Sequence, residues 1–165
     1  QFNNSPIVRY EVFSDSHGRL DYALRVLKEA GKPDLILHAG DNYRDGLRLA
    51  EITGLPVKAV PGNCDQGEQE PLELLLELAG YRILMTHGHK VPYEQMHERL
   101  LARAAETGAD AVVFGHTHTA EIRKDAGVLF FNPGSIAKPR DQQRPSYGIL
   151  DLGKDGIKPL ICRVL

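Results

Sequence analysis

Six apolar segments of this 165-residue chain end in the same way, and this repetition constrains the fold more than any other feature of the sequence. Each segment has the length and composition of a strand, and each breaks at glycine or proline beside Asp, Asn, His or Ser. The segments are VRYEVFSDSHG, LILHAGD, VKAVPGNCD, YRILMTHGH, AVVFGHTH and VLFFNPGS, which start at residues 8, 35, 57, 81, 111 and 128. They predict a sheet whose strands deliver polar side chains to one common edge.

Helical spacing is found between the first strands. Leu20–Ala30 has leucines at positions 20, 24 and 27, and Gly31 and Pro33 follow it as stop signals. Leu47–Ile52 and Tyr93–Glu106 are expected to form two further helices. The order β-α-β-α-β favours a parallel, layered α/β sheet with its loops gathered at the carboxyl edge.

The later part of the chain is rich in strand signals. Pro71–Leu78 contains LELLL, which suits a helix, but it is short and is joined to YRILMT by Ala79-Gly80, so we favour an antiparallel hairpin. Hairpins are also expected over residues 121–131, with a turn at 125–127, and over 146–165, with a turn at 154–156.

The composition, 42% hydrophobic and 25% charged, predicts one globular domain, which we expect to span residues 7–165. Residues 1–6, QFNNSP, are expected to be disordered or foreign to the native chain. The net charge of −2 gives no strong signal for nucleic acid, and no apolar run approaches the roughly 20 residues that cross a membrane. Cys64 and Cys162 form no CxxC pair, which favours reduced thiols and a cytoplasmic protein. The β-rich C-terminal edge leaves a homo-oligomer open.

Seven side chains at the strand breaks are candidate metal ligands. A single Asp or His after a strand is usually a cap or a surface residue, but seven at one edge would be costly without a common partner. A mixed Asp, Asn and His set suits Mn²⁺ best, with Fe²⁺, Zn²⁺ or Ni²⁺ as alternatives. Two cations need a bridging anion, for which Asp41 is the natural candidate. The D-x-H and H-x-H spacings are expected to point both side chains to one side of the strand. The candidates are Asp15, His17, Asp41, Asn63, His87, His116 and His118.

Taken in order, SDSHG, GD, GNCD, THGH and GHTH resemble the motifs of the calcineurin-like binuclear metallophosphoesterases. GNCD and the late NPGS resemble their small bacterial and archaeal phosphodiesterase branch, and the resemblance extends from about Ile7 to the end of the chain. It implies a single-domain, four-layer α/β/β/α sandwich that holds two divalent metal ions. By this resemblance, one metal would be bound by Asp15, His17 and His118 and the other by Asn63, His87 and His116, with Asp41 bridging.

The resemblance also implies hydrolysis of a small phosphodiester by a metal-bridging hydroxide, without a side-chain nucleophile. We expect Asp41, Asn63, Cys64 and His89 to act in catalysis. Cys64 stands where larger family members carry a histidine that protonates the leaving group, and a thiol with a pKa of about 8.5 is a weaker donor near neutral pH. This favours diesters with good leaving groups, although Cys64 could equally be a small buried residue without a role. His89 is expected to touch the phosphate or to orient His87.

Other polar residues have weaker signals. His38 is expected in the core or beside a ligand, and His97 on a solvated helix face. Asp45 falls one place late for the GDxxD pattern of many family members, so it is not assigned. The NPGS segment, residues 132–135, is expected to bring the backbone close to the site.

Three other functions compete with that of a phosphodiesterase. A metallo-β-lactamase-like hydrolase would need HxHxDH, which the segment HGHKVP at 87–92 does not supply. A non-catalytic scaffold, such as the similar eukaryotic retromer subunit, is disfavoured because all seven ligand positions hold competent donors. A phosphomonoesterase or nuclease of the same family is compatible with the ligands.

Overall fold

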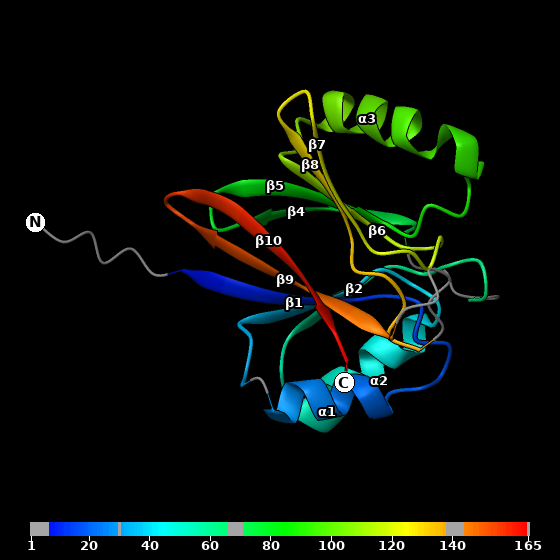
Figure 1. Cartoon of the computed structure of the whole chain (residues 1–165), viewed down its shortest axis with the longest axis vertical. Coiled ribbons are helices and arrows are strands. Elements are labelled where there is room, and N and C mark those ends of the chain that lie inside the picture. Colours follow the sequence, from blue (N-terminus) through cyan, green and yellow to red (C-terminus); the bar gives the residue numbers. More distant parts are fainter. Residues whose placement is uncertain (1–6, 30, 66–70, 138–143, 165) are drawn as a thin grey trace, which may run out of the picture.

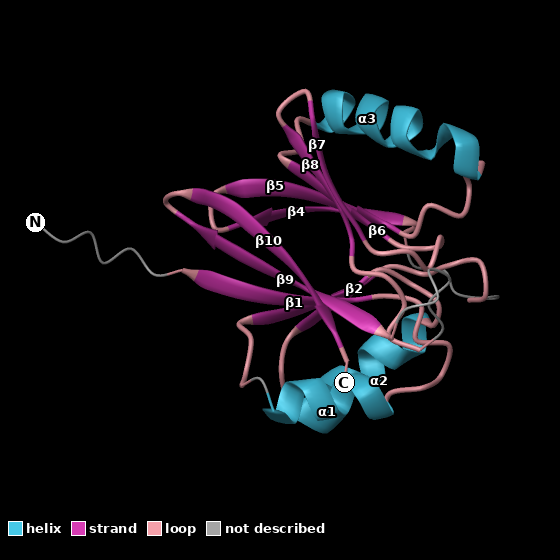
Figure 2. Ribbon diagram, in the orientation of Figure 1, coloured by secondary structure: helices cyan, strands magenta, loops and turns pink. Residues whose placement is uncertain are grey.

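The structure is a computed structural model that describes residues 7–29, 31–65, 71–137 and 144–164. The predictions for residues 1–6 and for Ala30 fall outside these ranges. The described residues form two five-stranded sheets with helices on their outer faces (Figures 1 and 2). None of their helices has the length and apolar composition needed to cross a membrane.

The first sheet has the strand order β10-β9-β1-β2-β3 and the second has the order β4-β5-β6-β8-β7. In the first, β1 pairs in parallel with β2 and β2 with β3, whereas β9 and β10 are antiparallel additions. In the second, β5, β6 and β8 are parallel, and β4 and β7 are antiparallel edge strands. The strands are β1 (Val8–Phe13), β2 (Leu35–His38), β3 (Val57–Ala59), β4 (Glu73–Leu78), β5 (Tyr81–Thr86), β6 (Ala111–Phe114), β7 (Glu121–Asp125), β8 (Val128–Asn132), β9 (Ser146–Gly153) and β10 (Gly156–Arg163). The helices are α1 (Asp21–Glu29), α2 (Tyr43–Thr53) and α3 (Met96–Thr107), and α3 is preceded by the 3₁₀ turn η1 (Tyr93–Gln95).

The two sheets pack face to face, and this contact forms the central core. Because side chains alternate along a strand, Tyr10 and Val12 of β1 enter this core with Met85 and Val113 of the second sheet. Phe13 points the other way and packs with α1 and α2, whereas Leu84, Val112 and Phe130 pack with α3. The four-layer α/β/β/α sandwich expected from the resemblance is therefore confirmed.

Most of the expected elements are present. β4 pairs antiparallel with β5, so the hairpin interpretation of Pro71–Leu78 was correct. The turns at 125–127 and 154–156 close the β7–β8 and β9–β10 hairpins. The helix predicted over Leu47–Ile52 was too short, because α2 begins at Tyr43. The side chain of Asn42 accepts a hydrogen bond from the backbone N–H of Arg44 and caps the helix.

The position expected for His97 was only partly right, because 24% of its side chain is exposed and the rest is packed. Its Nε2 lies 2.7 Å from Oδ2 of Asp125, and its ring lies 4.6 Å from the ring of Phe130. A partly exposed residue of α3 is thus held against the β7–β8 hairpin.

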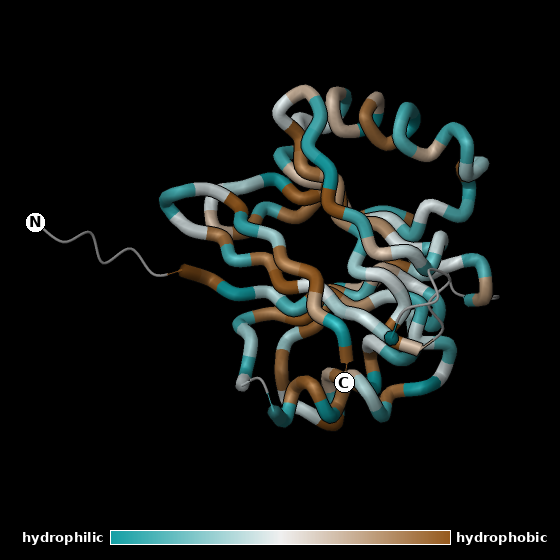
Figure 3. The backbone as a smooth tube through the Cα atoms, viewed as in Figure 1, coloured by the Kyte–Doolittle hydropathy of each residue, from teal (hydrophilic) through white to brown (hydrophobic). Residues whose placement is uncertain are grey.

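The parallel strands β1, β2, β3, β5, β6 and β8 end at the same side of the sandwich, where Figure 1 shows their loops crowded together. Hydrophobic residues are spread over the strands and helices, whereas these loops are mainly neutral to hydrophilic (Figure 3). The six sequence motifs lie at the ends of these strands and in the loops that follow, and they bring the candidate ligands to one region.

Candidate metal centre

Asp15, His17 and His118 form the first group of candidate ligands. Oδ1 of Asp15 lies 3.2 Å from Nε2 of His118 and 3.9 Å from Nε2 of His17, and the two imidazole nitrogens are 3.3 Å apart. The other carboxylate oxygen of Asp15 is held in place, because it accepts hydrogen bonds from Oγ of Ser14 (2.8 Å) and from the backbone N–H of His116 (3.1 Å). Oδ1 is buried without a hydrogen-bond partner among the described residues. A buried carboxylate oxygen facing imidazole nitrogens suits a divalent cation, which would supply the missing partner.

Asn63, His87 and His116 form the second group. Oδ1 of Asn63 lies 3.1 Å from Nε2 of His87 and 3.2 Å from Nδ1 of His116. Nδ1 of His87 lies 2.7 Å from the carbonyl oxygen of Ala39, which can only accept, so this nitrogen carries the proton and donates it. Nε2 of His87 is thereby directed toward the other ligands, as in metal sites where the second ring nitrogen is anchored to a carbonyl.

Asp41 lies between the two groups. Its Oδ2 is 3.2 Å from Nε2 of His87, and its Oδ1 accepts a hydrogen bond of 2.9 Å from the backbone N–H of Cys64. Ligand atoms of Asp15, Asp41 and His87 all lie within 4.8 Å of one another, and so do those of His17, Asp41 and Cys64. A carboxylate in this position can contact cations in both groups.

The candidate ligands have an unusual backbone conformation. The φ angles of Asp15, His17, Asp41, His116 and His118 are 54°, 49°, 47°, 70° and 61°. The left-handed region is costly for residues other than glycine and is retained where the surrounding structure enforces it, often at functional sites. The reason expected for the D-x-H and H-x-H spacings was therefore wrong: these pairs converge through left-handed turns beyond the strands, not through alternation along a strand.

The electrostatics of the site differ from one residue to another. Burial opposes ionisation of Asp41, but hydrogen bonding and charge interaction with His87 hold the pKa of Asp41 below its usual range. Burial and the neighbouring His87 lower the pKa of His116, and burial with His87 and Lys90 lowers that of His89. Neutral imidazoles are the form that binds metal or accepts a hydrogen bond.

Asp45, which the sequence left unassigned, has a clear structural role. It is 2% exposed, and its Oδ2 accepts hydrogen bonds from Oγ of Ser16 (2.6 Å) and from the backbone N–H of Gly18 (2.7 Å). Ser16 uses its only proton in this bond, so His38 donates from Nε2 to Oγ of Ser16 over 2.9 Å. Burial lowers the pKa of His38 to about 4, which keeps it neutral. Asp45 and His38 together fix the loop that carries His17.

Asp65 is a second residue that sequence reasoning missed. Its carboxylate accepts hydrogen bonds from the backbone N–H groups of Asp41 (3.2 Å), Tyr43 (2.9 Å) and Gly62 (2.8 Å). It thereby ties the loop after β3 to the loop after β2. Its place as the last residue of GNCD was the signal that could have found it.

The NPGS segment lies against the site, as expected. Oγ of Ser135 donates to the carbonyl of Asp15 over 2.7 Å, and Nδ2 of Asn132 donates to the carbonyl of Gly115 (3.2 Å) and to Oγ1 of Thr117 (3.0 Å). The segment therefore braces the loops of both motifs that supply the first group.

Cys64 and His89 border the centre. Cys64 is exposed, so the interpretation of it as a buried residue was wrong, and partial burial together with the charge of Asp41 raises the pKa of its thiol. The ring of His89 lies 5.6 Å from that of His87, and Nδ1 of His89 is buried with no hydrogen-bond partner in the described part of the chain.

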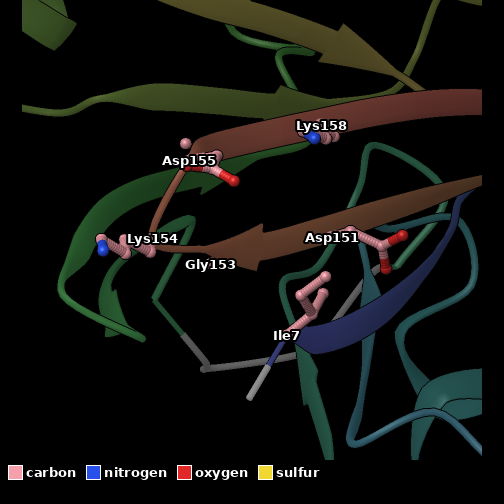
Figure 4. A pocket seen from close by; sticks show the side chains of 7 residues that line it. Ile7, Asp151, Gly153, Lys154, Asp155 and Lys158 are labelled. Atoms are coloured by element: carbon pink, nitrogen blue, oxygen red, sulfur yellow. The ribbon is translucent and has the colours of Figure 1, made fainter. Parts of the chain in front are cut away.

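A pocket of about 290 Å³ lies at the opposite end of the sandwich (Figure 4). It is lined by Ile7, which precedes β1, and by Asp151, Lys154, Asp155 and Lys158 around the β9–β10 turn. Because the candidate ligands follow the carboxyl ends of the strands, this pocket takes no part in the metal centre.

Comparison with known proteins agrees with this geometry. The family model of the calcineurin-like phosphoesterase superfamily domain matches residues 9–155. The chain is 38% identical over 146 residues to the probable metallophosphoesterase YsnB of Bacillus subtilis, covering 87% of this chain and 84% of that one. It is 32% identical to the phosphodiesterase YfcE of Escherichia coli K12, with 84% of each chain covered. Among solved structures, a conserved protein from Streptococcus pneumoniae TIGR4, described as a predicted phosphoesterase, has a TM-score of 0.76 and 28% identity, covering 95% of this chain and 99% of that one.

Proposed function

We propose that this chain hydrolyses small phosphodiesters with two divalent metal ions, because it belongs to the calcineurin-like phosphoesterase superfamily. Membership makes it a metal-dependent phosphoesterase; the diester preference, the two-metal centre and manganese as the metal are the proposal. The observation that carries it is the buried Oδ1 of Asp15, which faces His118, His17 and His87 at 3.2, 3.9 and 3.7 Å and has no hydrogen-bond partner in the described ranges.

The distances support a division of the ligands into two sets. Asp15, His17 and His118 would hold one cation, and Asn63, His87 and His116 the other, with Asp41 contacting both. When bound, two such cations supply a water acidic enough to attack phosphorus and positive charge for the phosphoryl oxygens.

The protein's own residues would position these groups. Asp45 and Asp65 fix the ligand loops, and His87 is oriented by the carbonyl of Ala39. His89, at the edge of the centre, would donate a hydrogen bond to a phosphoryl oxygen, since its Nδ1 has no partner among the described residues. Free Cys64 and Cys162 support a cytoplasmic location within the same proposal.

The diester preference rests on the similarity to the phosphodiesterase YfcE, whereas Cys64 bears on the leaving group. Its thiol is exposed beside Asp41, and its raised pKa makes it a poor proton donor near neutral pH. A leaving group that needs no protonation, such as an aryl oxide expelled from a diester, suits this site better than an alkoxide.

The test is hydrolysis of an aryl phosphodiester beside the matching monoester, by protein that has been stripped of metal and reloaded with Mn²⁺. We expect metal-dependent turnover that favours the diester and falls by a factor of about 10²–10³ in Asp41→Asn, because a single electrostatic group contributes on that scale. Asp155→Asn, the same chemical change in the exposed β9–β10 turn, should retain full activity.

Two outcomes would contradict the proposal. Folded protein that binds Mn²⁺ but turns over neither ester would point to a scaffold role. Faster turnover of the monoester would overturn the diester preference and leave the phosphoesterase assignment standing.

A further inference from the structure

A second cavity, of about 380 Å³, begins at His89 and lies between α3 and the β4–β5 hairpin. Leu72, Thr86, Val91 and Leu100 contribute to its lining, which is mostly apolar. Its volume lies within the range of about 300–1,000 Å³ that is typical of small-molecule sites.

The cavity adjoins the candidate metal centre through His89. His89 lines it, and the ring of His89 is 5.6 Å from the ring of His87. Gly88 between them has a φ of 93°, a conformation that allows the chain to turn from the metal ligand into the cavity wall. A Cβ atom at Gly88 would lie 3.1 Å from Sδ and Cε of Met96, so the start of α3 packs closely on this turn.

The rim of the cavity carries an excess of positive charge. Lys90 and Arg99 line it and are exposed. Arg103 also lines it, but its guanidinium forms an ion pair with Glu73, the acidic residue of the lining, and a second ion pair of 3.0 Å with Glu106. Arg99 donates a hydrogen bond of 3.0 Å to the neutral amide oxygen of Gln95, and it forms no ion pair with a carboxylate among the described side chains. Lys90 and Arg99 are therefore the charges available to a ligand.

We propose that this cavity binds the organic substituent of the phosphodiester, and that it selects a flat apolar group bearing its own anionic substituent. The inference rests on the proposed function, because it assigns the substrate class of that site. The apolar wall accommodates a ring, Arg99 and Lys90 pair with its anion, and His89 lies where the ring joins the phosphate at the metal centre.

Binding alone tests the cavity independently of catalysis. The probe is 2-naphthalenesulfonate, titrated by calorimetry into metal-free protein, with neutral 2-naphthalenesulfonamide as the uncharged comparator. We expect Arg99→Glu to weaken sulfonate binding about fivefold and to leave the sulfonamide unchanged, since a rim charge contributes on that scale. Arg48→Glu, the same change on the exposed face of α2 in the opposite helical layer, should change neither affinity.

A second variant fills the cavity without entering the core. Leu72 is 45% exposed at its rim, so Leu72→Trp should fold and should weaken both probes. Equal affinity of wild type, Arg99→Glu and Leu72→Trp for the sulfonate would overturn the proposal.

Kinetics then separate the two proposals. Two aryl phosphodiesters that differ only in a sulfonate on the leaving aryl group are compared in the Mn²⁺-loaded enzyme. We expect Arg99→Glu to lower kcat/KM about fivefold for the sulfonated ester alone. An equal effect on both esters would refute the selection of an anion, whereas absence of wild-type turnover with both would refute the proposed function while the calorimetric result stands.

Discussion

Asp45→Ala is the most informative perturbation of the candidate metal centre, because Asp45 is not a candidate ligand but fixes the loop that carries one. Its Oδ2 holds Oγ of Ser16 and the N–H of Gly18, the residues on either side of His17. The substitution removes both hydrogen bonds and leaves all seven candidate ligands present.

The size of the effect follows from what each donor keeps. A hydrogen bond to a charged group contributes about 1.5–3 kcal/mol, but Gly18 is exposed, so water can replace its partner, and Ser16 retains its bond to His38. We therefore expect a loss of about 2 kcal/mol in the free energy of unfolding, at the low end for two such bonds. Removing a residue that orients a metal ligand typically lowers metal affinity about 10–100-fold. We expect Asp45→Ala to lower by this factor the Mn²⁺ affinity of the set formed by Asp15, His17 and His118.

The assay is calorimetric titration of Mn²⁺ into metal-free protein, with folding verified by circular dichroism. The set formed by Asn63, His87 and His116 should keep its affinity, because it is anchored separately through Ala39 and Asp65. Asp45→Asn retains an oxygen acceptor and should recover part of the loss, and Asp155→Ala should resemble wild type.

Equal weakening of both sets would refute this reasoning, since it would mean that Asp45 supports the fold in general. Unchanged Mn²⁺ affinity in folded Asp45→Ala would refute it as well, because the loop of His17 would then hold its position without Asp45.

Three further predictions concern stability and metal loading. Burial raises the pKa of Glu11 from its ordinary 4.5 to about 7, so its protonated form stabilises the fold below pH 4.5, and this contribution, about 3 kcal/mol at most, is lost as pH rises through 7. The free energy of unfolding of Glu11→Gln, measured in urea across pH 4–8, should lack this decline, and parallel pH dependences for both proteins would contradict the prediction. A Cβ at Gly115 would lie 2.1 Å from Oγ of Ser14 and 2.9 Å from Oδ2 of Asp15. Gly115→Ala should therefore lower the free energy of unfolding by about 1–3 kcal/mol and weaken Mn²⁺ binding, and an unaltered calorimetric affinity for Mn²⁺ would argue against that crowding. Mn²⁺ at 100 times its Kd should add about 2.7 kcal/mol to wild-type stability, seen as a higher Tm than in EDTA, whereas a similar rise in Asp15→Asn would count against Asp15 as a ligand.

Local sequence patterns predicted much of the fold. Strand-like runs that end in glycine or proline located β1, β2, β3, β5, β6 and β8, because these residues stop strands wherever they occur. The hairpin turn at 154–156 was likewise a local signal. The start of α2 was missed because Asn42 caps the helix before its first apolar residues appear.

The candidate site was predicted only as a set of residues. Their joint occurrence at strand ends, together with the family resemblance, identified the seven candidate ligands, and the structure places them in two groups linked by Asp41. The left-handed backbone at Asp15 and His118 was not foreseen, since tertiary contacts enforce a conformation that local preference disfavours.

The sequence by itself determined where the strands end and which polar side chains follow them, because strand propensity and chain-breaking residues act over a few neighbours. Only the tertiary structure decided that Asp45 fixes the loop of His17, that His97 pairs with Asp125, and that an apolar cavity with a positively charged rim adjoins His89. The first two features depend on groups that are 27 or 28 residues apart in the sequence, and the cavity has walls from separate elements. The packing of the layers brings these groups and walls together.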